Sequence, residues 1–76
     1  MVRSKKESTT KLIKQIKQAA KDADVEFYFV RSDGDHELYR LDGLNLVIPH
    51  GRQIKSGTAD GLRKRAAMKL GEKWWR

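Results

Sequence analysis

The chain lacks cysteine altogether and has a single proline among its 76 residues. Without cysteine it has no disulfide and no thiolate metal ligand, which fits a reducing compartment. No run approaches the ~18 consecutive apolar residues of a membrane-spanning helix, and no apolar stretch follows the basic start MVRSKKES. We therefore expect no membrane segment and no secretory signal, and one small domain over residues 1–76.

Charge is what the chain has in excess: 36% of its residues are charged and the formal net charge is +7 at pH 7. The cations lie at the two ends of the sequence. Residues 1–21 hold seven Lys or Arg and one acid, residues 22–42 two Arg and seven acids, and residues 43–76 eight Lys or Arg and two acids. A small domain of this kind usually binds a polyanion. Composition alone leaves open whether that is RNA, DNA or an acidic protein.

Two helices are predicted near the ends of the chain. After a flexible basic arm at residues 1–8, a helix begins at Ser8 or Thr9, either of which can cap it. Its apolar arc and its opposite lysine arc are Leu12, Ile13, Ile16, Ala19, Ala20, Ala23 and Lys11, Lys14, Lys17, Lys21. A second helix runs from Thr58 to about Leu70, with Ala59, Leu62, Ala66 and Leu70 as its buried stripe.

The tail at residues 71–76 holds both tryptophans. Gly71 is placed as the stop of the second helix. One more helical turn after it would bring Trp74 onto the buried stripe and turn Trp75 outward, because neighbouring helical positions diverge by about 100°. We therefore expect Trp75 to be the more exposed of the pair.

Three strands are predicted between the helices, at residues 25–31, 36–41 and 44–49, where β-branched and aromatic residues gather. A glycine-containing turn at residues 32–35 and the pair Asp42-Gly43 join them into an antiparallel meander. Pro49 ends the third strand, and residues 50–57 form a loop. The order α-β-β-β-α predicts an α+β fold of two layers, with both helices on one face of a three-stranded antiparallel sheet and the other face partly open.

The sequence has two histidines, His36 and His50, and these are its best candidates for a catalytic residue. Either can act as a general acid or base. His36 is the better placed, since it opens a strand directly after a glycine turn, and the acids on either side of it favour its protonated form. Those acids do not converge easily on a metal ion, because adjacent strand residues point to opposite faces. No phosphate-binding glycine loop or cofactor motif is recognisable, so no metal and no cofactor is expected.

Two segments resemble the HicA family of toxin–antitoxin mRNA interferases: GDHELY at residues 34–39 and VIPHGRQIKSGT at residues 47–58. Gly34, His36 and Tyr39 match the family's Gly-x-His-x-x-aromatic motif. The residues that match its second signature are Pro49, His50, Arg52, Ile54, Lys55 and Thr58. The order of elements is also similar to that family, whose fold is similar to the double-stranded-RNA-binding fold.

The resemblance implies a cytoplasmic toxin whose catalytic residue is His36 in a metal-independent endoribonuclease. It also implies a HicB-like antitoxin partner that covers the site. The sequence departs from many members in having the acids Asp35 and Glu37 on either side of the histidine, and these would repel phosphate locally.

An RNA-cleaving site also needs cations, which we expect from Arg40, Arg52 and Lys55, with Lys11 and Lys14 of the first helix binding RNA. The amides near residues 58–61 form a second candidate phosphate site. Tyr39 either stacks on an unpaired base or packs in the core. Two other functions stay open: a non-catalytic RNA-binding module, and a protein whose basic surface only docks on an acidic antitoxin.

Overall fold

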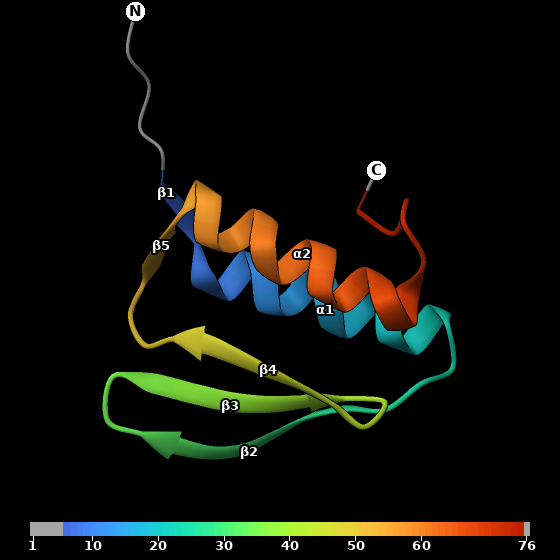
Figure 1. Cartoon of the computed structure of the whole chain (residues 1–76), viewed down its shortest axis with the longest axis horizontal. Helices are drawn as coiled ribbons and strands as arrows, with labels where there is room; N and C mark the ends of the chain where they lie inside the picture. The colour runs from blue at the N-terminus through green and yellow to red at the C-terminus, as the bar shows by residue number, and fades with distance from the viewer. Residues whose placement is uncertain (1–5, 76) are drawn as a thin grey trace, which may run out of the picture.

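The computed structural model describes residues 6–75 and has two layers (Figure 1). The elements are β1 (Lys6–Ser8), α1 (Thr9–Asp22), β2 (Phe27–Asp33), β3 (His36–Leu41), β4 (Leu44–Pro49), β5 (Gln53–Lys55) and α2 (Ser56–Leu70). Strands β2, β3 and β4 form an antiparallel sheet in that order. Helices α1 and α2 lie side by side on one face of it and run in the same direction. The predicted α+β class is confirmed.

Helix α1 begins where the sequence predicts. The side chain of Ser8 caps it by accepting a hydrogen bond of 3.2 Å from the backbone N–H of Lys11. The buried side of the helix carries Leu12, Ile16 and Ala20. These side chains pack on the sheet, and the lysines lie on the exposed side. The period of 3.6 residues thus separates the core face of α1 from its basic face.

The β3–β4 hairpin forms as predicted, with both strand ranges confirmed. Asp42 and Gly43 have φ values of 48° and 83°, the two positive values that a two-residue turn of this type requires. The first strand is shifted: β2 runs from Phe27 to Asp33, two residues later than predicted at both ends. Its pairing with β3 contains a β-bulge between Phe29 and Arg31.

The structure contains two strands that the sequence did not predict. Residues 6–8, expected in the flexible arm, form β1, and residues 53–55, expected in a loop, form β5. The two pair antiparallel, with Glu7 opposite Ile54. The backbone N–H of Thr9 also donates to the carbonyl of Arg52 at 2.9 Å. This pairing satisfies backbone groups at the entrance to both helices, so the arm prediction is wrong for residues 6–8. Its residues 1–5 lie outside the described part of the chain.

An ion pair fastens β1 to α2. The Glu7 carboxylate accepts hydrogen bonds from both terminal nitrogens of Arg63, whose side chain is only 13% exposed. Arg63 also donates to Asp60 at 2.9 Å. The Arg63 hydrogen bonds, with smaller help from the Arg63 charge and Ser56, hold the pKa of Glu7 below its usual value against the opposing effect of burial.

This ion pair predicts a specific acid sensitivity. A carboxylate whose pKa is lower in the folded than in the unfolded chain stabilises the fold above the unfolded pKa, and this contribution is lost as the pH falls through the folded pKa. Glu7→Gln is therefore expected to lower the free energy of unfolding at pH 7 and to differ little from the wild type well below pH 4.5, the ordinary Glu value. Urea unfolding at both pH values measures this, and an equal difference at both would contradict it.

The hydrophobic core lies between the helix pair and the sheet. Its buried members are Leu12, Ile16, Ala20, Leu41, Leu46, Ile48, Ile54, Ala59, Leu62 and Ala66. Every element except β1 and β2 contributes at least one buried apolar side chain, and Phe27 of β2 packs against the cluster. The core fixes which sheet face the helices cover and therefore which face stays open.

Helix α2 begins at Ser56, two residues before the predicted Thr58, and its N-cap residue Lys55 makes no side-chain capping bond. It ends at Leu70, and Gly71 with φ 94° is the predicted stop. The expected further helical turn is wrong, since residues 72–75 form a non-helical turn. The Gly71 backbone, with ψ 153°, turns the chain out of the helical path.

Trp74 reaches the core from this turn. It packs against the hydrophobic cluster, and its indole N–H donates to the Arg63 carbonyl at 2.9 Å. Trp75 contacts Trp74 edge-to-face, with ring centroids 5.6 Å apart. Both side chains are half-buried.

Trp74→Ala is expected to lower the free energy of unfolding by about 1–3 kcal/mol, less than the ~3–5 kcal/mol of a fully buried aromatic side chain. The variant loses both the contact of the Trp74 ring with the core and the hydrogen bond from its indole N–H to the Arg63 carbonyl. Trp75→Ala is the matched control, with an expected change within about 0.5 kcal/mol. Chemical denaturation of the two variants measures the difference. A larger loss for Trp75→Ala would overturn this division of roles.

Candidate functional site

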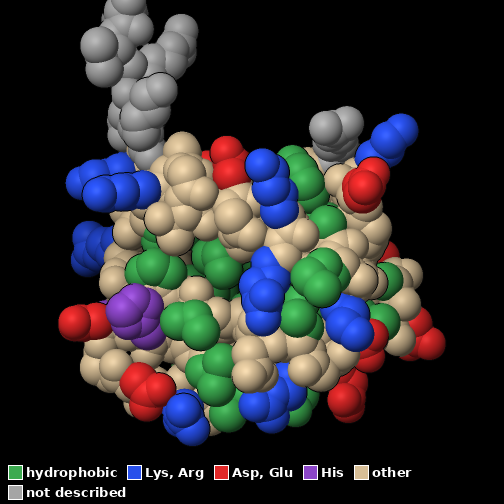
Figure 2. Space-filling model, in the orientation of Figure 1, with side chains coloured by type: hydrophobic (Ala, Val, Ile, Leu, Met, Phe, Trp, Pro, Cys, Tyr) green, Lys and Arg blue, Asp and Glu red, His purple; other side chains and the backbone are tan. Residues whose placement is uncertain are grey.

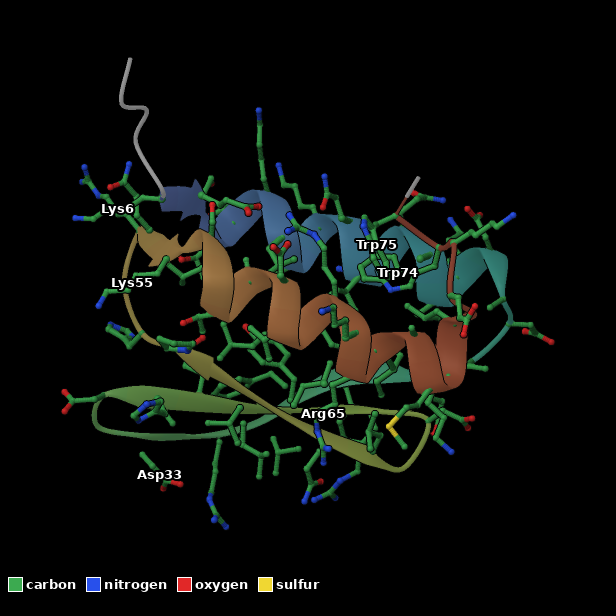
Figure 3. All side chains as sticks on the ribbon, turned by 45° about the horizontal axis from the view of Figure 1, so that its top comes forward. Lys6, Asp33, Lys55, Arg65, Trp74 and Trp75 are labelled. Carbon is green, nitrogen blue, oxygen red and sulfur yellow. The ribbon has the colours of Figure 1, made fainter. Side chains whose placement is uncertain are left out.

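The face of the β2–β3–β4 sheet that is turned away from the helices is uncovered. Side chains alternate between the two faces along each strand. Because Leu41, Leu46 and Ile48 are fully buried on the helix side, their strand neighbours point the other way. The side chains of the open face are Tyr28, Arg31, Asp33, His36, Leu38, Arg40, Asn45, Val47 and Pro49. Asp33, labelled in Figure 3, lies on the side of the sheet away from the helices.

Strand register arranges the open face in three rows across the sheet. Arg40 lies opposite Tyr28 and Asn45, Leu38 opposite Arg31 and Val47, and His36 opposite Asp33 and Pro49. Residues two apart on a strand are separated by about 6.8 Å. The face therefore carries an aromatic and polar row, a central apolar row with one arginine, and a row that ends the sheet at His36.

His36 is exposed at the first position of β3. No side chain in residues 6–75 hydrogen-bonds to its imidazole. The carboxylate of Asp33, its neighbour across the strands, is already paired with Arg31 at 3.1 Å. The imidazole is therefore available to an incoming ligand.

Arg40 shares this face with His36, about 14 Å farther along β3. Its Nε donates to Asn45 Oδ1 at 3.0 Å, which holds the guanidinium over the sheet. Of the predicted RNA-binding residues, Arg40 is thus the one that the sheet places on the same surface as the histidine.

Glu37 and Tyr39 face the other way. The Tyr39 hydroxyl donates to Glu37 Oε1 at 3.2 Å, and Nδ1 of His50 lies 3.2 Å from Glu37 Oε2. The Tyr39 ring stacks on Phe27 with centroids 5.2 Å apart. Burial, followed by the Glu37 charge, raises the pKa of Tyr39. The contacts of Tyr39 are those of a packing residue. Glu37 pairs with the second histidine, not with His36.

Gly34, Arg52 and Lys55 were also predicted as site residues, and the structure does not bring all three to the His36 end of the sheet. Gly34 has φ 68° and makes the turn before His36. The backbone N–H of His50 donates to the Asp35 carbonyl at 2.7 Å, which brings the loop that carries Arg52 to this end. Lys55 lies farther away, opposite Lys6 in the β1–β5 pair, where Figure 3 shows both side chains.

Lys11 and Lys14 lie on a different surface. Both are exposed on the side of α1 opposite its buried residues. The helix layer separates them from the open sheet face, so one short RNA segment cannot contact them and His36 together. On the side seen in Figure 2, Lys and Arg side chains run down the middle of the molecule and carboxylates lie nearer its margins.

The amides predicted as a phosphate site at residues 58–61 lie only partly at the start of α2, because the helix begins at Ser56 and only Thr58 of that range belongs to its first turn. The amides without a helical partner belong to its first turn, which begins at Ser56, and Gly61 lies inside the helix.

Two open-face residues were missed from the sequence, Tyr28 and Arg31. Regular pairing back from the turn would put Tyr28 on the helix side. The bulge between Phe29 and Arg31 shifts the register and turns Tyr28 outward. The aromatic run was visible in the sequence, but the bulge was not.

In residues 6–75, no three His, Asp or Glu side chains come together in a way that could hold a metal ion. Over the same residues, no helix is both long and apolar enough to cross a membrane. Comparison with known proteins finds no matching family model, no matching curated protein and no matching solved structure. The HicA resemblance therefore rests on its two sequence motifs and the order of elements.

Proposed function

We propose that the protein is a metal-independent endoribonuclease that binds RNA on its open sheet face and cleaves it with His36, as the toxin of a toxin–antitoxin pair. The observation that carries the proposal is the exposed His36 imidazole at the end of an uncovered sheet face that also carries Arg31 and Arg40.

The chemistry fits what one histidine can supply. RNA carries its own nucleophile: the 2′-oxygen attacks the adjacent phosphorus, the bond from phosphorus to the 5′-oxygen breaks, and the leaving oxygen needs a proton. The imidazolium of His36 donates that proton, while the 2′-hydroxyl proton passes to solvent. The fixed sheet and its arginines orient the RNA and balance the charge on the phosphorus.

An antitoxin partner of the HicB type is part of this proposal. A protein that covers the open face would block His36 and bury the apolar side chains there, and the positive charge of the chain favours an acidic partner. Such a complex forms in the cytoplasm, in line with the absence of cysteine. Copurification with the product of an adjacent reading frame, and loss of RNA cleavage in that complex, tests this part.

Incubation of the purified protein with unstructured RNA, with and without EDTA, tests the activity. We expect cleavage in both reactions, with fragments that end in a cyclic phosphate. Cleavage that EDTA abolishes would contradict the metal-independent mechanism.

A non-catalytic RNA-binding module is the second candidate. The observation that favours it is the basic face of α1, formed by Lys11, Lys14, Lys17 and Lys21, which lies apart from His36. Lysines on a helix can follow the phosphates of a duplex by shape. Binding of double-stranded RNA without cleavage of any RNA would support this function over the first.

A further inference from the structure

We propose that Tyr28, Arg40 and Asn45 form a binding site for one unpaired RNA base, two rows along the open face from His36. This inference rests on the proposed function, since it says where a base of the RNA binds while the phosphate to be cleaved lies at His36.

The three side chains form one continuous row across the sheet. Tyr28 of β2 lies directly opposite Arg40 of β3, which lies opposite Asn45 of β4. Side chains opposite one another in an antiparallel sheet have Cβ atoms about 4.5–5.5 Å apart. Tyr28 is 46% exposed.

Tyr28 is the aromatic residue of the central sheet that remains available on the open face. Phe27 and Tyr39 stack on each other beneath the helices, and Phe29 contacts the Tyr39 ring edge-on at 5.5 Å. In residues 6–75 the Tyr28 ring takes part in no ring pair. An exposed aromatic ring on a rigid sheet is a stacking platform for a base that is out of a duplex.

The polar groups of the row match the edge of a base and its phosphate. The Arg40 Nε is held by Asn45, and within the described chain its terminal nitrogens make no hydrogen bond. Arg65 of α2 adds a second guanidinium at this edge, with its Nε donating to the Asn45 carbonyl at 2.8 Å (Figure 3). The one carboxylate of the open face, Asp33, is paired with Arg31. The row therefore offers cations and no free carboxylate.

The spacing of the rows favours a single strand. Rows about 6.8 Å apart are twice the ~3.4 Å rise per nucleotide of a stacked duplex strand. A strand that follows the rows must therefore have its bases unstacked from each other. The middle row, with Leu38 and the 52% exposed Val47, gives apolar surface to sugars or bases that a duplex would not present. A base on Tyr28 is then about two nucleotides from the phosphate at His36.

The test uses short single-stranded oligonucleotides with 2′-O-methyl groups, which lack the attacking hydroxyl and are not cleaved. Fluorescence anisotropy gives the Kd of the wild type and of Tyr28→Ala. We expect Tyr28→Ala to bind about 10-fold or more weakly, the loss of one base–aromatic stack, and Tyr28→Phe to bind nearly as the wild type. Phe29→Ala is the matched control: the adjacent ring is 50% exposed but faces the helix side, so its variant should keep the wild-type Kd.

An abasic site moved along the oligonucleotide sharpens the test. At one position, the abasic site should weaken binding to the wild type. The same abasic oligonucleotide should bind Tyr28→Ala no more weakly than the intact oligonucleotide does, because the stacking contact is already absent in that variant. That position should lie about two nucleotides from the phosphate that the protein cleaves in unmodified RNA. The annealed duplex should show no dependence on Tyr28.

The outcomes separate this inference from the proposed function. If the wild type binds and cleaves RNA and Tyr28→Ala has an unchanged Kd, the base site is wrong and the nuclease stands. If binding depends on Tyr28 but no RNA is cleaved, the base site stands and the nuclease is wrong. If Tyr28→Ala weakens only a complex with an acidic partner protein, the row is a protein interface and the base site is overturned.

Discussion

His36→Ala is expected to reduce RNA cleavage by about 10²–10⁴-fold, the usual contribution of a positioned general acid or base. Folding should be unaffected, because the side chain is exposed and no side chain in residues 6–75 hydrogen-bonds to it. Exposed substitutions of this kind change the free energy of unfolding by about 0.5 kcal/mol or less. RNA affinity should also be nearly kept, since Arg40 and the other rows remain. A cleavage time course and an oligonucleotide Kd measure the two effects.

His50→Ala is the matched control for this prediction. It removes the same type of side chain from the same end of the sheet, but His50 pairs with Glu37 on the other face. We expect its cleavage rate to stay within a few-fold of the wild type. A folded His36→Ala protein that cleaves at the wild-type rate would remove His36 from the mechanism. A large loss in His50→Ala alone would transfer the role to His50.

Leu46→Ala is expected to have the largest effect on stability. Leu46 is fully buried at the centre of β4 beneath the helices, and cutting back such a side chain costs about 2–5 kcal/mol. A domain of this size is stabilised by about 4–11 kcal/mol in total, so the variant loses a large part of it. The melting temperature should fall by about 10 °C or more. Circular dichroism during thermal and urea unfolding measures the change.

Val47→Ala is the control one residue along the same strand. Val47 lies on the open face and is 52% exposed, so the same kind of truncation should change the free energy of unfolding by about 0.5 kcal/mol. The contrast tests which sheet face the helices cover. Equal losses in the two variants would mean that the open face is buried as well, for example in a stable dimer.

The sequence by itself determined the helices, the β3–β4 hairpin and the face on which His36 and Arg40 lie together. Apolar periodicity marks the buried side of α1, and the pair Asp42-Gly43 marks a turn that needs positive φ at both residues. Alternation then assigns His36 and Arg40 to one face. These features follow from local patterns, because each depends on residues close together in the chain.

Only the tertiary structure decided the features that join distant segments. The β1–β5 pair and the contact of Glu7 with Arg63 link the first described residues to α2, and short strands have no sequence signal of their own without a partner. The position of Trp74 depends on the backbone of Gly71, which leaves the helix instead of continuing it.

The bulge in β2 is the clearest case for the site. A one-residue change of register moves every later side chain to the other face. The bulge between Phe29 and Arg31 therefore decides that Tyr28 joins Arg40 on the open face, while Phe29 stays beside Tyr39. The sequence supplies both aromatic rings, and the bulge decides which of them shares the open face with Arg40.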